Sequence, residues 1–417
     1  MKIKLLRIKL HWQILIALFL GILYGLYLTE YASWVEWLGT LFLRALQMVI
    51  IPLILTSIIS GITQIGSGRN LGRLGIKTLF YYISTSTLAI LTGLVLVNLI
   101  HPGSGADLGF SQQVEGFSTE SKSFGETLIE IIPTNVFEAF SEGRMLSVIF
   151  FALLFGFFIT RIKKEKAVVL VDFFQAGFQV VMKITLLIIR FTPFGVFGII
   201  TGNVSNILLE QGSGGMSALL ELGGRLGLYM ITVFSGLLIH ALIILPSIQL
   251  FIGGIKPLKH FRAVTTPLLT AFSTSSALAT LPLTLEAVEH EDGVSNKISS
   301  FTLPLGATIN MDGTALYECV AVFFIAQAYG LDLGFGQQAI VVITALLASI
   351  GAAAVPMAGL FMISIILTAI GLPLEGVGLI VAVDRILDMF RTATNVWSDT
   401  TGAVVIARTE GEELKVT

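Results

Sequence analysis

The stretch Val383–Gly402, VDRILDMFRTATNVWSDTTG, places charged residues in an otherwise apolar chain. Its polar residues are spaced 4, 3, 4 and 4 apart, which at 100° per residue confines them to an arc of about 80° on one helix face. They are Asp384, Asp388, Arg391, Asn395 and Asp399, and Thr392 extends the arc. The stripe is about 22 Å long, which is most of the hydrocarbon thickness of a membrane.

Charges along such a length of membrane helix are costly. Each one at the centre of the helix costs about 2.5 to 3.5 kcal/mol, so charged groups face the protein interior and mark an ion or solute path. The carboxylates outnumber Arg391, and Arg385 at the edge of the arc does not balance them. Asp and Asn oxygens suit a hard cation, whereas the planar fork of Arg391 suits a carboxylate. The alternative is a structural ion-pair network built on Asp388 and Arg391 at i,i+3.

The remaining composition is that of a polytopic membrane protein. Of the 417 residues, 54% are hydrophobic and 12% are charged, and the mean hydropathy is +0.88. A single cysteine, Cys319, excludes an intramolecular disulfide. Apolar runs long enough to cross a core of about 30 Å occur at 12–29, 37–66, 78–100, 145–161, 167–207 and 217–254.

The charges between these runs alternate in sign. Basic segments follow every second run, at 1–9, 69–77, 161–166 and 256–262. Under the positive-inside rule this predicts a multi-pass protein of the cell (inner or plasma) membrane with both termini in the cytoplasm. A cleavable signal peptide over residues 1–33 is the alternative for the first run.

Two later apolar segments are interrupted at mid-length. Residues 257–292 have two short arms around the polar cluster Ser273–Ser276, and residues 335–372 have similar arms around a Gly/Ala/Pro tip at Gly351–Gly359. Half-length arms predict re-entrant helical hairpins, and each is followed by a polar span. The alternation of charge predicts that the first hairpin enters from the cytoplasm and the second from outside, so each hairpin with its following span would form one of two inverted repeats. Such repeats indicate a transporter with a binding site near the middle of the membrane. Ordinary kinked helices are the alternative.

The span between the hairpins, 294–328, contains INMDGTALYE. Asn310, Asp312 and Thr314 surround a glycine, and upstream Gly and Pro would loosen the helix and free carbonyls for an ion. Glu318 follows at membrane depth with no basic residue nearby in the sequence. A buried carboxyl there favours its neutral form and is a candidate proton carrier, the alternative being a Glu that is only hydrogen-bonded in the packing.

At NMDGT (310–314) and D-x-x-x-D-x-x-R-T-x-x-N-V-x-x-D (384–399) the chain resembles the glutamate transporter family of dicarboxylate/amino acid:cation symporters. MVIIPLI at 48–54 and both hairpins also fit. The resemblance implies an all-α fold of eight transmembrane helices plus two re-entrant hairpins, forming homotrimers in the bilayer with a scaffold domain and an elevator-like transport domain.

The implied domains follow the chain in order. The scaffold holds 1–77 (spans 1 and 2) and 125–210 (spans 4 and 5). The transport domain holds 78–102 (span 3), 217–254 (span 6), 257–292 (hairpin 1), 294–328 (span 7), 335–372 (hairpin 2) and 376–410 (span 8).

The resemblance also implies the site. Arg391 resembles the residue that binds the side-chain carboxylate of the substrate, and Asp388 the residue that binds its amino group. The other implied substrate contacts are Thr314, Thr392, Asn395, Ser276, Ala277, Val355 and Gly359. Three sodium sets are implied: Gly306, Asn310, Asn395 and Asp399; Tyr82, Thr85, Ser86, Asn310 and Asp312; and carbonyls of Thr308, Ser349 and Ile350.

Several positions depart from the family pattern. Ala277 and Leu278 replace serines at the first tip, and Ala354 and Met357 replace smaller or polar residues at the second. The last motif usually ends N-V-x-G-D, whereas this chain has Ser398 before Asp399. Glu318 matches animal members, in which this glutamate is linked to proton cotransport and potassium countertransport.

The sequence therefore predicts a sodium-driven importer of L-aspartate or L-glutamate, with Arg391 setting selectivity and Glu318 adding proton coupling. A C4-dicarboxylate or neutral amino acid symporter is the nearest alternative, and Asp388 disfavours the former because its charge suits an ammonium group. An anion channel is the alternative from another class. No organic cofactor or nucleic-acid partner is expected, and an enzyme is disfavoured because catalytic motifs are lacking.

Overall fold

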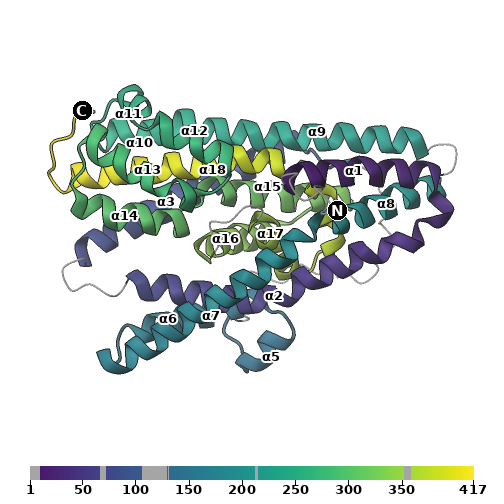
Figure 1. The fold of residues 1–417 in the computed structure, drawn as a ribbon, viewed down its shortest axis with the longest axis horizontal. Coiled ribbons are helices and arrows are strands. Elements are labelled where there is room, and N and C mark those ends of the chain that lie inside the picture. Colours follow the sequence, from purple (N-terminus) through teal and green to yellow (C-terminus); the bar gives the residue numbers. More distant parts are fainter. Residues whose placement is uncertain (1–9, 66–71, 106–128, 130, 212–214, 352–357) are drawn as a thin grey trace, which may run out of the picture.

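A computed structural model describes residues 10–417 except 66–71, 106–128, 130, 212–214 and 352–357. The regular elements that it describes are all helices (Figure 1). In chain order they are α1 (Leu10–Tyr27), η2 (Thr29–Tyr31), α2 (Ser33–Ile65), α3 (Gly72–Ile100), α5 (Val136–Ser141), α6 (Met145–Ile159), α7 (Lys164–Arg190), α8 (Thr192–Gln211), α9 (Gly215–Ile239), η5 (His240–Ile244), α10 (Leu245–Phe251), α11 (Pro257–Ala263), α12 (Thr265–Thr274), α13 (Ala277–Ala287), η6 (Val288–Asp292), α14 (Asn296–Ile309), α15 (Asp312–Ala328), α16 (Phe335–Gly351), α17 (Ala358–Ile370), η7 (Leu374–Gly376) and α18 (Val377–Thr409).

Many of these helices have the length and composition of membrane spans. Among the described residues, six helical stretches are long and apolar enough to cross a bilayer, namely Ser33–Thr63, Arg73–Ile100, Lys164–Arg190, Thr192–Leu209, Gly215–Phe251 and Asn296–Ala328. Helices satisfy their own backbone hydrogen bonds, which lipid cannot do. The prediction of an all-helical, multi-pass membrane protein is confirmed.

The apolar run expected over 167–207 is divided. It forms two consecutive helices, α7 and α8, separated by Phe191. Pro193 in the first turn of α8 has no N–H to continue the hydrogen-bond ladder of α7, which accounts for the interruption. Both helices contact α2.

Both interrupted segments form pairs of short helices in contact with each other, α12 with α13 and α16 with α17. In the first pair the chain reverses at Ser275, whose φ is +52°. Ser276 then caps α13 by accepting a hydrogen bond from the amide of Ala279. In the second pair the tip lies outside the described residues, and so do Ala354, Val355 and Met357.

The span with the NMDGT motif is two helices, α14 and α15. α14 ends at Ile309 and α15 begins at Asp312, so Asn310 and Met311 form a break within the fold. This agrees with the expected loosening of the helix. Every residue of α15 is buried, which makes it the central helix of the protein.

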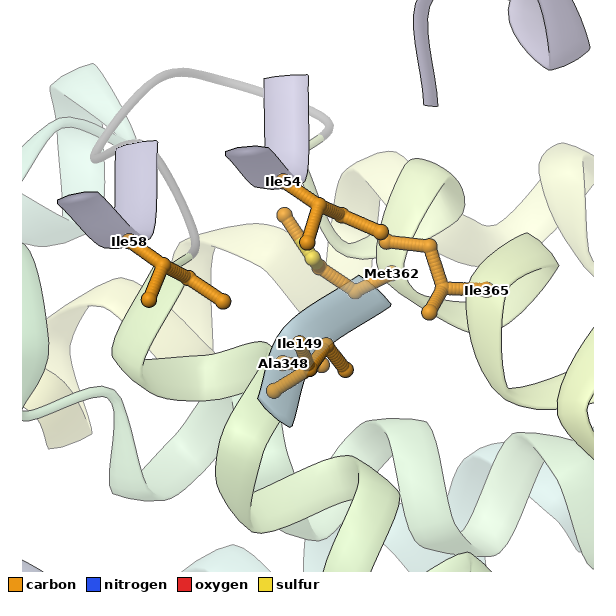
Figure 2. A pocket seen from close by; sticks show the side chains of 6 residues that line it. All are labelled: Ile54, Ile58, Ile149, Ala348, Met362 and Ile365. Carbon is orange, nitrogen blue, oxygen red and sulfur yellow. The ribbon is translucent and has the colours of Figure 1, made fainter. Parts of the chain in front are cut away.

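Two groups of helices can be distinguished in Figure 1. In one, α2 contacts α6, α7 and α8, and α8 contacts α1. In the other, α15 contacts α3, α9, α16, α17 and α18, and α18 in turn contacts α12, α13 and α14. Figure 2 shows an apolar seam where the groups meet, lined by Ile54 and Ile58 of α2, Ile149 of α6, Ala348 of α16, and Met362 and Ile365 of α17.

Candidate functional site: a buried polar stripe on α18

The polar stripe of α18 is buried, as its helical spacing predicts. α18 contacts α15, α12, α14 and α9, and these neighbours remove the stripe from solvent. Its members Asp384, Asp388, Arg391, Thr392, Asn395 and Asp399 are each at most 6% exposed. The charges therefore must be stabilised by groups within the protein or by what the protein binds.

Arg391 is the centre of one end of the stripe, which we call the arginine end (Asp384, Asp388, Arg391 and Tyr317). Its Nη2 lies 2.8 Å from Asp388 Oδ1 and 3.0 Å from Asp384 Oδ1. The guanidinium lies over the ring of Tyr317 at 3.8 Å, and the Tyr317 hydroxyl donates to Asp384 at 2.7 Å. Arg385 lies 3.4 Å from the other oxygen of Asp388. The i,i+3 pair considered as an alternative therefore exists.

The ion pairs occupy only one side of the Arg391 guanidinium. Its Nε and Nη1 are buried and have no hydrogen-bond partner among the described residues. Gly359, at the start of the second arm of the α16/α17 pair, lies against this side: a Cβ there would be 2.6 Å from Nη1. Arg391 thus retains two nitrogens, which together carry three N–H bonds, for a ligand.

Asn395 connects α18 to the break before α15. Its side-chain oxygen accepts from the Gly313 amide at 2.8 Å, and its nitrogen lies 3.1 Å from the Thr314 hydroxyl. Thr314 on α15 and Thr392 on α18 are both buried. Ser276 and Ala277 lie at the start of α13, a helix that contacts α18.

The second end of the stripe, which we call the carboxylate end, is built on Asp312 and Asp399. Asp312 is fully buried and accepts from four side chains on three helical segments. Oδ1 accepts from Ser86 at 2.6 Å and from Thr85 at 3.3 Å, and Oδ2 lies 2.6 Å from Ser398 Oγ and 3.0 Å from His240 Nε2. Hydrogen-bond donors from three helical segments thus surround this carboxylate.

Asp399 lies beside the end of α14. It accepts from Asn310 Nδ2 at 2.9 Å. A Cβ on Gly306 would be 2.4 Å from Asp399 Oδ1 and 2.7 Å from the Tyr82 hydroxyl, so the absence of a side chain lets these oxygens approach. Tyr82 donates to the Thr302 carbonyl at 2.7 Å. The structure thus brings together members of the first two predicted sodium sets.

The third predicted sodium set is less closely joined. α14 and α16 are in contact, but the described hydrogen bonds of Thr308 and Ser349 run locally, to Leu305 and Leu346. Ser349 and Ile350 are consecutive residues of α16.

Glu318 lies one helical turn beyond Thr314 on α15. It is fully buried, and neither carboxyl oxygen has a hydrogen-bond partner among the described residues. The alternative reading, in which Glu318 is only hydrogen-bonded within the packing, is therefore not supported among the described residues.

Three contributors to the site were not identified from the sequence. The sequence analysis singled out neither Tyr317 nor His240, and it noted Ser398 only as a departure from a motif. His240 begins the π-helical segment η5. A lone histidine inside a membrane span was the signal that could have identified it.

The helical membrane fold and the buried stripe define a transporter. The chain matches the model of the sodium:dicarboxylate symporter family over residues 10–409, and it belongs to this family. It is 35% identical to Excitatory amino acid transporter 3 of Oryctolagus cuniculus, covering 98% of this chain and 87% of the relative. It is 33% identical to the Proton/glutamate-aspartate symporter of Escherichia coli (strain K12), covering 98% and 94%. It is 35% identical to the Proton/sodium-glutamate symport protein of Bacillus subtilis (strain 168), again covering 98% and 94%. The family is one of transporters, so the protein is not an enzyme.

Proposed function

We propose that this protein is a secondary active symporter that imports acidic L-amino acids, aspartate or glutamate, together with sodium. The observation that carries the proposal is the arginine end. Two buried nitrogens of Arg391, Nε and Nη1, remain for a ligand, and a carboxylate matches a guanidinium fork with two parallel hydrogen bonds. Relatives named for glutamate and aspartate support the choice of solute.

The neighbouring carboxylates favour an amino acid over a simple dicarboxylate. Asp388 is nearly buried and carries negative charge beside Arg391. An α-ammonium group would be attracted to it, whereas a second solute carboxylate would be repelled. Asp388 would thus hold the amino group, while Arg391 holds the side-chain carboxylate.

Sodium coupling is supported by the carboxylate end. Its acceptors are carboxylate, amide and hydroxyl oxygens, the type that hard cations prefer. Asp312 and Asp399 have no cationic side chain of Lys or Arg among their described hydrogen bonds. Bound sodium would offset their charge, and one relative's name includes sodium.

Uptake into reconstituted vesicles tests this function. Labelled L-aspartate or L-glutamate is added outside the vesicles. An inward sodium gradient should drive accumulation of the label, and an equal inward potassium gradient should not. Uptake indifferent to the sodium gradient would remove the coupling. If excess succinate inhibited uptake of the label as strongly as unlabelled L-aspartate, a C4-dicarboxylate symporter would be favoured. If neutral amino acids inhibited it as strongly, a neutral amino acid symporter would be favoured. Currents that flow without solute would favour an anion channel.

Proton coupling through Glu318 is a second candidate, favoured by its buried and unpartnered oxygens. A protonated carboxyl is less costly to bury than a carboxylate, and two relatives are named for protons. We expect Glu318→Gln, which preserves the shape, to flatten the pH dependence of uptake. Glu286→Gln, at an exposed position on α13, serves as the control. An unchanged pH profile in Glu318→Gln would exclude the role.

The architecture proposed with this function has eight membrane spans, two re-entrant hairpins, and both termini in the cytoplasm of a cell-membrane protein. The two helix groups support a division into a scaffold (α1, α2 and α6–α8) and a moving transport domain, with the apolar seam of Figure 2 between them. Such a seam lacks hydrogen bonds that sliding would break. A homotrimer is proposed as the assembly, and mass measurement of the purified protein would test it.

A further inference from the structure

Ser398 is fully buried between the two carboxylates of the carboxylate end. Its Oγ lies 2.6 Å from Asp312 Oδ2 and 3.0 Å from Asn310 Nδ2. A serine hydroxyl has one hydrogen to donate and two lone pairs to accept with. Asp312 offers only acceptors and the Asn310 amide nitrogen only donors, so Ser398 donates to the aspartate and accepts from the asparagine.

Asn310 continues this chain of hydrogen bonds to the second carboxylate. Its amide nitrogen carries two hydrogens, and the two acceptors within reach are Ser398 Oγ and, at 2.9 Å, Asp399 Oδ1. The result is a continuous path from Asp399 through Asn310 and Ser398 to Asp312. Both hydrogens of the amide are used, which fixes the plane of the Asn310 side chain.

The fixed amide plane aims the Asn310 oxygen. Thr85 Oγ1 lies 3.3 Å from this oxygen and also 3.3 Å from Asp312 Oδ1. Asn310 belongs to both of the predicted sodium sets that the structure assembles, one containing Asp399 and the other Asp312. A change in the orientation of the Asn310 side chain would therefore alter both sodium sets.

We infer that Ser398 is a positioning residue for cation binding, which holds the Asn310 amide and links the Asp312 and Asp399 sites so that they fill cooperatively. A cation at Asp399 changes the acceptor strength of that carboxylate for Asn310. The change reaches Asp312 through Ser398, because cooperative hydrogen-bond chains polarise one another. A glycine at this position would leave one Asn310 hydrogen without this acceptor. The inference rests on the proposed sodium coupling.

The inference is tested by titrating the purified protein with sodium in the absence of amino acid. Binding is monitored through the fluorescence of the protein's tryptophans, one of which is the neighbouring Trp397. Ser398→Ala removes only the hydroxyl. We expect the sodium concentration for half-saturation to rise about tenfold, as for loss of a hydrogen bond to a charged group, and the Hill coefficient to fall toward one. Ser398→Gly should behave like Ser398→Ala, and Ser398→Thr, which keeps the hydroxyl, should stay near the wild type.

Thr400→Val is the matched control, because the buried Thr400 hydroxyl on the same helix donates only to the Trp397 carbonyl, at 3.0 Å, in the described contacts. It should leave both sodium parameters unchanged. If Ser398→Ala does not fold, Ser398→Cys serves the same test because a thiol is a weak donor.

Unchanged or tighter sodium binding in Ser398→Ala overturns the inference. A weaker affinity with an unchanged Hill coefficient, or a wild-type coefficient of one, overturns the linkage between the sites. These outcomes leave the proposed function standing, whereas a wild-type protein whose amino-acid affinity does not respond to sodium at all removes the proposed function itself.

Discussion

Arg391 and Asp399 lie on the same face of α18, yet the hydrogen bonds of the arginine end and of the carboxylate end are arranged in opposite ways. At the arginine end, Arg391 is paired on one side and has two buried nitrogens without partners among the described residues. At the carboxylate end, Asp312 is surrounded by four donors on its two oxygens. The charged group of the arginine end therefore has nitrogens that await acceptors, whereas both oxygens of Asp312 at the carboxylate end already accept hydrogen bonds within the protein.

This difference suggests two modes of binding. An open guanidinium favours a ligand that brings its own acceptors, so the solute completes the hydrogen bonds of the arginine end. A carboxylate held by several donors keeps its position, so a cation meets oxygens that need little rearrangement. Substitutions at the two ends should therefore separate solute affinity from sodium affinity.

The largest effect is expected for Arg391→Ala. The change removes the proposed carboxylate ligand and leaves Asp384 and Asp388 without their common partner, and losses of this kind cost about 2 to 5 kcal/mol. L-aspartate binding at saturating sodium should weaken by about 30-fold to several thousand-fold by the same principle, as measured by calorimetry. Sodium binding without amino acid should persist. The control is Arg385→Ala, at the edge of the stripe, and an equal loss in the control would contradict the assignment.

The next effect concerns the opposite end. Asp399→Asn keeps the shape of the side chain but removes its charge, so sodium affinity in the absence of amino acid should fall about 30-fold, as for a charge-assisted contact. At saturating sodium, L-aspartate affinity should change far less. Asp172→Asn, at an exposed position on α7, is the control. If solute affinity at saturating sodium falls as much as sodium affinity, the two ends are not separable.

An intermediate effect is expected where the arginine end opens toward α17. In Gly359→Ala the new methyl group would lie 2.6 Å from Arg391 Nη1 and 3.1 Å from Tyr317. Arg391 is held by two carboxylates and cannot withdraw freely, so L-aspartate affinity should fall about tenfold through crowding. Gly61→Ala, which has open space around it, controls for a general effect of alanine. Unaltered solute binding would show that the solute does not approach from this side.

The smallest effect is expected for Tyr317→Phe. The ring beneath Arg391 remains, and only the hydroxyl that donates to Asp384 is lost. L-aspartate affinity should fall about threefold, which corresponds to one ordinary hydrogen bond, with sodium binding unchanged. Exposed Tyr27 supplies the control substitution Tyr27→Phe. A hundredfold loss would mean that the orientation of Asp384, and not the open side of Arg391, limits binding.

The sequence predicted the stripe because helical periodicity is a local property. Spacings of 3 and 4 put Asp384 to Asp399 on one face whatever surrounds the helix, and the cost of charge in lipid requires that face to be buried. The arms and reversal of the first hairpin and the break at Asn310 were predicted on similar local grounds, from Ser, Gly and Pro in apolar sequence. The split between α7 and α8 had a local signal too, Pro193, that was not used.

Contacts between distant helices were not predictable in this way. His240 and Asp312 are 72 residues apart, and Ser398 and Asp312 are 86 apart. Which donor meets which acceptor depends on the rotation and height of each helix, and packing of the whole bundle sets both. The resemblance to a family supplied the members of the sodium sets, but Ser398 differs from the usual motif, so its bond to Asp312 had no precedent there.

The break between α14 and α15 has a consequence for how the protein can change over evolution. It brings the negative end of one helix dipole and the positive end of another to Asn310 and Asp312. These partial charges belong to the peptide backbone, and no side-chain replacement removes them. Substitutions on α18 can therefore change which solute is bound without removing the part of the attraction for the cation that comes from the backbone. The preference for the solute is thus freer to diverge during evolution than the preference for the cation.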